Sequence, residues 1–188
     1  MAINKQTFLH NVTILHDTRE QENRHILETL DRLKVKHEEK KLDYGDYSFS
    51  IDGRDFSLSC VVERKANADE LYNNIMQGRE RLENELEAGC KLSNQFTLLL
   101  ENCGSMEELK GIQVPDADML KYHRRVREIG LHCYTALKSW QCGNRYQFRT
   151  VLVKDKAKTA AQLLEEFYYY WRNYKTMTAG RRGQRGSK

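Results

Sequence analysis

Short apolar runs alternate with amphipathic segments along this chain, and that alternation constrains its fold more than any other feature. Residues 12–16 (Val-Thr-Ile-Leu-His) and 96–101 (Phe-Thr-Leu-Leu-Leu-Glu) are typical of buried strands. Apolar residues recur at helical spacing near 26–33, 68–88 and 157–174. Strands that alternate with helices predict an α/β domain whose mixed β-sheet is flanked by helices.

Further elements follow from similar patterns. Residues 36–51 contain two strand-like pieces, and residues 58–65 alternate as another strand. Gly89 marks the expected end of the helix that begins near residue 68, because glycine commonly follows a helix. A helix near 118–129 and a weaker strand at 147–153 complete the predicted order before the last helix.

The composition fits one ordinary domain and excludes several classes of protein. The chain has 188 residues, 31% of them charged, with a single proline and 11 glycines. That composition disfavours low-complexity and collagen-like chains, and no apolar run approaches the roughly 20 residues of a membrane span. The first residues lack a signal-peptide core, and the five cysteines include no C-x-x-C pair. We therefore expect reduced thiols and a cytoplasmic protein, or a nucleoid-associated one in a bacterial host.

The net charge of +4 is unevenly distributed. From residue 172 to the end there are six cations and no acid, so subtracting these six from +4 leaves −2 for the rest of the chain. We expect a folded domain over 1–175 and a basic, disordered tail over 176–188. The tail either binds nucleic-acid phosphates non-specifically or only solubilises the chain; its candidate contacts are Arg181, Arg182 and Arg185.

Three acids and a lysine carry most of the chemical information. Glu63 and Lys65 are two residues apart on a predicted strand, so both side chains point to the same face. Asp46 lies near the end of the preceding strand, where a hairpin places it opposite Glu63. Asp17, at the end of the first strand, is placed to reach the same point as a third carboxylate.

Carboxylates gathered in this way suit a hard divalent cation, which takes oxygen ligands. Such a cation lowers the pKa of a bound water and offsets the charge that develops during phosphodiester hydrolysis. Lys65 would orient that water or offset the same charge. The alternative is a set of surface ion pairs, because a D…ExK pattern also arises by chance in a chain with 31 basic and 27 acidic residues.

Three strings in order, Asp17-Thr-Arg-Glu20, Gly45-Asp46-Tyr47 and Glu63-Arg-Lys-x-x-x-Asp69, resemble the signature of the XPF-type structure-specific endonucleases. That family belongs to the wider PD-(D/E)XK, or restriction-endonuclease-like, nuclease fold. The resemblance spans residues 12–101 and implies a nuclease that uses Mg²⁺ or Mn²⁺. It implies that Asp46 and Glu63 bind the metal with Asp17, and that Lys65 is the catalytic lysine.

The resemblance also assigns supporting positions. Arg19 and Glu20 match the first string, where the alternative is an ion pair beside the site. Arg64 points to the strand face opposite Glu63 and is expected to hold the architecture or a phosphate. Asp69 matches the last acid, although an acid is favoured at a helix start in any case. Arg79 occupies a position where the family often has a basic residue, so a phosphate contact is expected.

The chain also departs from the family pattern. Many members continue into paired helix-hairpin-helix modules, and neither these nor helicase motifs are found here. The compact chain suggests a bacteriophage or mobile-element member and leaves the preferred DNA structure open. No Gly-rich phosphate loop occurs, so no nucleotide cofactor is expected.

Two internal segments could replace the absent DNA-binding modules. Residues 121–127 place four cations on a predicted helix, which suits phosphate contacts or is a solvated helix face; the four are Lys121, Arg124, Arg125 and Arg127. The aromatic stretch 167–171 either stacks on unpaired bases or, as its helical spacing favours, packs in the core or at a dimer interface.

The sequence therefore predicts a metal-dependent DNA endonuclease that acts in DNA repair or recombination. Its expected substrates are flaps, forks or junctions, cut to leave a 5′-phosphate and a 3′-hydroxyl. One alternative is a non-catalytic DNA-binding or scaffolding member of the family, and another is a PD-(D/E)XK nuclease with a different nucleic-acid substrate. A homodimer is expected from the resemblance and from the apolar face of the last helix.

Overall fold

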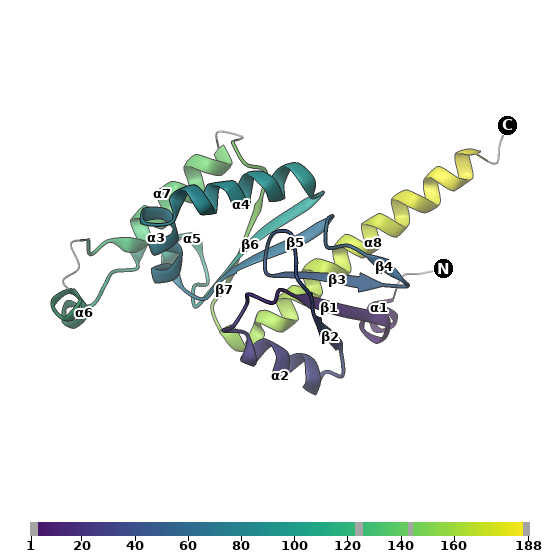
Figure 1. Cartoon of the computed structure of the whole chain (residues 1–188), viewed down its shortest axis with the longest axis horizontal. Helices are drawn as coiled ribbons and strands as arrows, with labels where there is room; N and C mark the ends of the chain where they lie inside the picture. The colour runs from purple at the N-terminus through teal and green to yellow at the C-terminus, as the bar shows by residue number, and fades with distance from the viewer. Residues whose placement is uncertain (1–3, 123–125, 143–144, 186–188) are drawn as a thin grey trace.

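A mixed β-sheet lies between two layers of helices in the computed structural model, which describes residues 4–122, 126–142 and 145–185 (Figure 1). The strand order is β2-β1-β3-β5-β6-β7, and the short β4 pairs with β3. β3 is antiparallel to β1 and β5, whereas β1–β2, β5–β6 and β6–β7 are parallel pairs. The strands are β1 (Val12–His16), β2 (Lys36–Glu39), β3 (Tyr47–Ile51), β4 (Arg54–Asp55), β5 (Cys60–Lys65), β6 (Gln95–Glu101) and β7 (Arg149–Val153).

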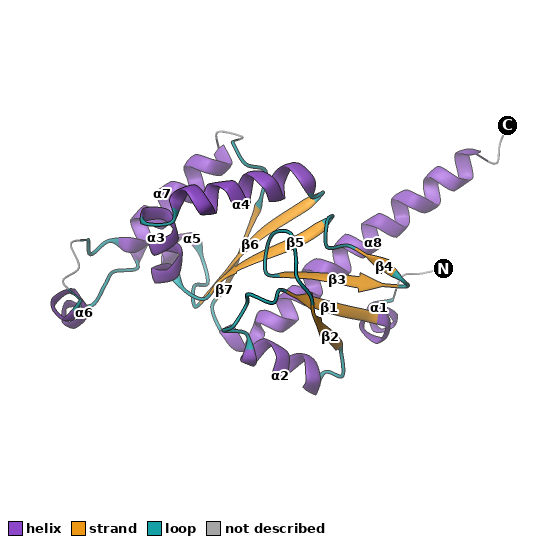
Figure 2. Ribbon diagram, in the orientation of Figure 1, coloured by secondary structure: helices purple, strands orange, loops and turns teal. Residues whose placement is uncertain are grey.

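The helices form two layers that cover opposite faces of the sheet (Figure 2). One layer contains α1 (Lys5–Asn11), α2 (Arg24–Arg32) and α8 (Thr159–Arg185). The other contains α3 (Ala68–Met76), α4 (Arg79–Leu92), α5 (Met106–Gly111) and α7 (Ile129–Cys142). The short α6 (Asp116–Lys121) projects from the body, and a 3-10 turn, η1 (Lys156–Lys158), precedes α8.

Side chains alternate along β5, so successive residues face opposite layers of helices. Val62 packs in the core under α2 and α8, whereas Val61 packs in the core under α3 and α4. Glu63 and Lys65 therefore share the α3/α4 side with Val61. Arg64 shares the α2/α8 side with Val62, as the sequence predicts.

The aromatic residues of α8 are core residues. Phe167 is fully buried and stacks on Phe49 with 5.0 Å between ring centroids, and Trp171 lies 5.5 Å from the ring of Phe8. Buried aromatic rings each remove a large apolar area from water. The packing interpretation of the stretch 167–171 is therefore confirmed, and base stacking by its buried rings is not supported.

Several predicted element boundaries are wrong. The single helix expected over 68–88 is two helices, α3 and α4, and Gly89 lies inside α4 rather than after it. A Cβ at Gly89 would lie 2.3 Å from the ring of Phe96, so glycine is there to let the helix approach β6. The expected helix 118–129 is only the short α6, whereas α5 and α7 were not predicted.

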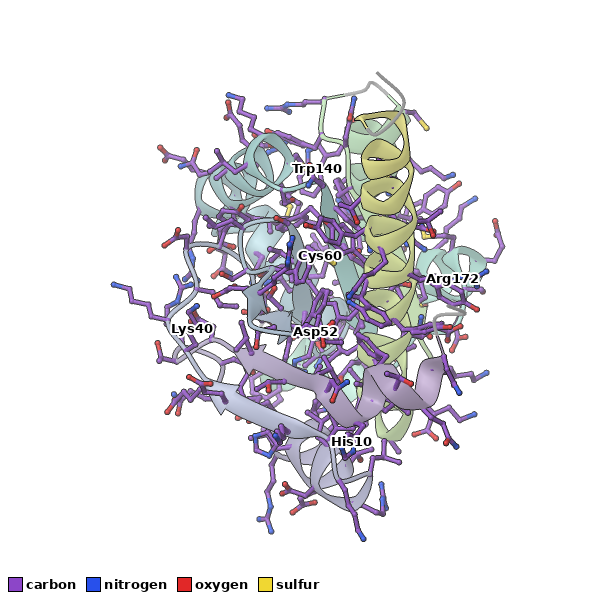
Figure 3. All side chains as sticks on the ribbon, turned by 90° about the vertical axis from the view of Figure 1, so that its right-hand side faces the viewer. His10, Lys40, Asp52, Cys60, Trp140 and Arg172 are labelled. Atoms are coloured by element: carbon purple, nitrogen blue, oxygen red, sulfur yellow. The ribbon has the colours of Figure 1, made fainter. Side chains whose placement is uncertain are left out.

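α8 extends further than the sequence indicates. It continues to Arg185, where a disordered tail was expected from residue 176, and its last part projects beyond the sheet in Figure 1. Within α8, Lys175 pairs with Asp52 at 3.0 Å, and Arg172 is exposed (Figure 3). The domain boundary at 175 remains a prediction. No helix in the described part of the chain is long and apolar enough to cross a membrane.

Candidate active site

Asp46 and Glu63 face each other across the β3–β5 ladder, as the hairpin argument predicts. Tyr47 pairs with Val62 in this antiparallel register, which places the preceding Asp46 opposite Glu63. The Asp46 amide donates to the Val62 carbonyl at 2.9 Å, and its carboxylate accepts from the Arg64 amide at 2.7 Å. Backbone hydrogen bonds therefore fix both the strand and the Asp46 side chain.

Gly45 is required for this approach. Its φ is +73°, a value that favours glycine, and a Cβ there would lie 2.1 Å from the Val61 side chain and 3.2 Å from the Val62 carbonyl oxygen. Glycine at position 45 therefore lets the backbone bring Asp46 close to β5, the strand that carries Glu63.

Lys65 is bound to Glu63 on the same strand face. Its Nζ donates to Glu63 Oε1 at 2.7 Å, and both side chains are 6% exposed. Glu70 at the start of α3 lies 3.8 Å from the same Nζ and also accepts from the Ala66 amide at 2.8 Å. Glu70 is not among the predicted site residues, so its proximity to Lys65 was missed.

The pKa values of Asp46 and Glu63 show that the site disfavours ionised carboxylates. Loss of solvation, together with the charge of Glu63, raises the pKa of Asp46 well above its ordinary value despite Lys65. Burial likewise raises the pKa of Glu63, although Lys65 opposes it. Burial lowers the pKa of Lys65, but Glu63 and the other nearby acids outweigh burial and the net change is upward. Added positive charge would therefore stabilise the ionised acids.

Asp17 lies next to Asp46 but directs its carboxylate elsewhere. The Asp17 amide donates to the Asp46 carbonyl at 2.8 Å. Its two carboxylate oxygens accept from Arg19 at 2.5 Å and from the Leu42 amide at 2.6 Å. Burial raises the pKa of Asp17, but these hydrogen bonds outweigh burial and lower it overall.

The expected triad of Asp17, Asp46 and Glu63 is not assembled. Among the described residues, no three acidic, histidine or cysteine side chains gather in a group that could hold a metal ion. The physical reason is the competition of Arg19 and Leu42 for the Asp17 oxygens. Asp17 instead orients Arg19, whose side chain is 56% exposed beside the acids.

Arg64 is the centre of a buried ion cluster on the opposite face of the sheet. Its guanidinium donates to Glu20 at 3.0 Å, to Glu101 at 2.8 Å and to the Glu22 carbonyl at 3.2 Å. The other oxygen of Glu101 contacts His25 Nε2 at 2.7 Å. The architectural role expected for Arg64 fits this cluster. Glu20 forms an ion pair, as the alternative for it held, but on the face opposite Glu63. Glu101 and His25 were missed, although an acid that ends an apolar strand is a detectable signal.

Glu85 of α4 is a further neighbour that the sequence did not single out. Its charge is among those that raise the pKa of Glu63, and it pairs with Arg81 at 3.1 Å. It also lines a cavity of about 450 Å³ with Asp43 and Tyr44, which directly precede Gly45. This cavity therefore opens next to the turn that carries Asp46.

The contacts of Arg79, Lys121 and Arg127 lie away from Asp46 and Glu63. Asp69 lies in the first turn of α3, and Arg79 is an exposed residue of α4 that pairs with Glu83 at 2.8 Å. Lys121 lies 4.9 Å from the Tyr122 ring centroid, and Arg127 pairs with an acid of α6. Arg124 and Arg125 lie outside the described residues, and the side chains of Arg181, Arg182 and Arg185 lie outside the described part of the structure.

The mixed sheet flanked by helices places this chain among α/β domains with the XPF nuclease-like fold. Residues 16–165 match the ERCC4 domain, so the chain belongs to the ERCC4 family of nuclease domains, whose members are generally metal-dependent endonucleases. No curated protein sequence matches the chain.

Two solved structures share the fold. XPF from Aeropyrum pernix is 22% identical with a TM-score of 0.59, and the match covers 84% of this chain and 61% of that one. XPF from Aeropyrum pernix in complex with DNA gives 22% identity and a TM-score of 0.59, with 86% and 66% covered. The chain thus spans less than two thirds of either XPF chain, and at this identity the similarity establishes the fold.

Proposed function

We propose that this domain is a Mg²⁺- or Mn²⁺-dependent DNA endonuclease. Its proposed substrates are branched or partly single-stranded DNA, cut to leave a 5′-phosphate and a 3′-hydroxyl. The observation that carries the proposal is the pair Asp46 and Glu63, held opposite each other with Lys65 on Glu63. Membership of the ERCC4 family and the similarity to an XPF bound to DNA support the reaction class and the substrate.

A divalent cation fits the donor set of this site. Asp46 and Glu63 offer carboxylate oxygens, the donors that Mg²⁺ and Mn²⁺ prefer. Their raised pKa values mean that a cation between them would relieve both loss of solvation and mutual repulsion. When bound, the cation would supply an acidified water and neutralise charge on the phosphate. Asp17 enters this proposal as an orienting residue that could also contribute an oxygen.

The cationic side chains have separate tasks. Lys65 stays protonated because the acids around it raise its pKa, so its Nζ can offset charge on the cleaved phosphate and orient the attacking water. Arg19 donates to Asp17 and to the Leu42 carbonyl, yet its side chain is 56% exposed, so the exposed part of its guanidinium can contact the DNA backbone. Arg64 is saturated by Glu20 and Glu101, so we assign it to the support of β5 rather than to the phosphate.

The competing hypothesis is a non-catalytic DNA-binding partner. Inactive members of such a family are expected to lose the motif acids, whereas this chain keeps all of them. The chain retains the acids Asp17, Asp46, Glu63 and Asp69, together with Lys65. Partly buried charges destabilise a fold, so a chain that keeps them is expected to use them in catalysis.

A substrate panel tests the proposal. Forks, flaps, junctions and plain duplexes are incubated with a Mn²⁺ or Mg²⁺ titration, and the product ends are mapped. We expect cleavage of the branched substrates that EDTA abolishes, and a loss of at least about 100-fold in Asp46→Asn with DNA binding retained. If every substrate stays intact at all metal concentrations while binding is tight, the chain is a binding module and the proposal is wrong.

A further inference from the structure

A second cavity lies on the face of the sheet opposite Glu63 and Lys65. Its volume is about 480 Å³, and it opens between the start of α2, the ends of β5 and β6, and η1. Arg64 and Glu101 of the ion cluster form part of its wall. The cavity is therefore built on the back of the strand that carries the proposed catalytic residues.

The charges on the floor of this cavity are buried and already paired. Arg64 donates to Glu20, Glu101 and a backbone carbonyl, and Glu101 also contacts His25. Both Arg64 and Glu101 are nearly inaccessible to solvent. Charges paired in this way hold their geometry but offer little to a ligand, so recognition must come from the rim.

The rim carries groups with hydrogen-bonding capacity to spare. Within the described part of the chain, the Lys156 ammonium has no ion-pair partner, and its residue is exposed. Asn67 uses its side-chain oxygen to cap α3, which leaves its NH₂ available. Asn102, at a φ of +58°, donates to the Ala66 carbonyl, which leaves its side-chain oxygen available. A cation, an amide donor and an amide acceptor thus surround one opening.

We propose that this cavity receives a phosphate-bearing nucleotide of an unpaired DNA strand. Lys156 would contact the phosphate, and the amides of Asn67 and Asn102 would meet the donors and acceptors of a base edge. This inference rests on the proposed function, because it names the place where a branched substrate puts its unpaired strand. The lining also contains the exposed Glu22, which has no ion-pair partner among the described residues, and the Arg24–Glu28 pair. These acids leave room for one phosphate beside Lys156 but disfavour a run of phosphates.

The position of the cavity relative to the catalytic pair suits this role. Ala66 and Asn67, which line the cavity, directly follow Lys65 along the chain. Adjacent Cα atoms are about 3.8 Å apart, so the opening begins one residue beyond the catalytic strand. An unpaired strand would therefore pass around the end of β5, from Lys65 towards Asn67.

The test compares two lysines of the same 3-10 turn. Lys156 lines the cavity, whereas Lys158 is equally exposed but does not line it. Binding of fluorescein-labelled oligothymidylate is measured by anisotropy in EDTA over a range of salt concentrations. We expect Lys156→Ala to weaken affinity by about three- to tenfold at low salt and to reduce the slope of log affinity against log salt by about 0.7. Lys158→Ala should change neither.

The outcomes separate this inference from the nuclease proposal. An unchanged slope in Lys156→Ala, or an equal loss in Lys158→Ala, overturns the cavity assignment even if branched DNA is cleaved. Displacement of the oligonucleotide by inorganic phosphate or thymidine monophosphate at matched phosphate concentration indicates a free-nucleotide site and also overturns it. If no DNA is cleaved but the Lys156 effect is present, the nuclease proposal fails while the cavity assignment stands.

Discussion

Asp46 is a residue at which stability and the proposed function conflict. It is partly buried opposite Glu63, and this environment disfavours its ionised form. Its folded-state pKa is raised, so the folded protein holds the proton more tightly than the unfolded chain does. Above that raised pKa the ionised Asp46 therefore destabilises the fold, and this penalty is lost as the pH falls below the ordinary carboxyl pKa.

Asp46→Asn is accordingly expected to raise the free energy of unfolding of the metal-free protein at neutral pH. Asparagine keeps an oxygen for the Arg64 amide but removes the repulsion with Glu63. Chemical denaturation at neutral and acidic pH measures the effect, which should shrink on acidification. Asp43→Asn, an exposed site in the same turn, is the control. A clear loss of stability in Asp46→Asn at neutral pH would contradict this account.

Arg64→Ala is expected to destabilise the fold strongly. It removes the cation that Glu20 and Glu101 share, and leaves Glu20 without an ion-pair partner and Glu101 with only His25 as a partner. Breaking a buried pair costs about 3–5 kcal/mol, whereas the exposed Arg79–Glu83 pair should be worth less than about 1 kcal/mol. Urea unfolding of Arg64→Ala beside Arg79→Ala measures the difference, and equal losses would show that the cluster is not structural.

Part of the candidate site could be predicted from the sequence, residue by residue. The strand period and the hairpin are sufficient to place Asp46 opposite Glu63 and Arg64 on the other face. The partner of Asp17 could not be predicted in this way, because the Leu42 amide reaches it from a turn of irregular backbone. Glu101 and His25 meet Arg64 only through the packing of β6 and α2.

At the scale of elements, Gly89 shows how packing overrides a local signal. Glycine often follows a helix, yet here it lies inside α4 because only a hydrogen fits against the Phe96 ring. The strands were easier to predict, since short apolar runs specify them directly. The missed α7 contains Gly130, Cys133 and aromatic residues of modest helix propensity, so its helix depends on packing against α3 and α5.

Gly89→Ala should therefore destabilise the protein although alanine is the better helix former. A methyl group there would overlap the Phe96 ring, and overpacking of this kind costs about 1–3 kcal/mol. Gly111→Ala in α5 is the matched control, because a methyl group added there would have no atom within 4 Å, and it should be neutral or slightly stabilising. The melting temperatures of both variants test this prediction. A higher melting temperature for Gly89→Ala than for the wild type would mean that α4 can move away from β6.

At the scale of the whole molecule, the fold gives each face of one sheet its own task. The α3/α4 face presents Asp46, Glu63 and Lys65, while the α2/α8 face contains the Arg64 cluster and the aromatic core of α8. Side chains alternate along β5, so Glu63 and Lys65 point to one face and Arg64 to the other. The Arg64 cluster therefore supports, from the opposite face, the strand that carries the proposed catalytic residues. The fold class followed from the order of elements, but the strand order β2-β1-β3-β5-β6-β7 depends on non-local pairing.

We propose that Asp46 and Glu63 together hold the metal ion that DNA cleavage requires. The rate of fork cleavage against Mn²⁺ concentration for the wild type and Glu63→Gln tests this, with Mn²⁺ binding measured in parallel by calorimetry. We predict that Glu63→Gln loses both Mn²⁺ binding and at least about 100-fold in rate while its affinity for the fork is unchanged. Wild-type Mn²⁺ affinity and cleavage in Glu63→Gln would contradict the claim.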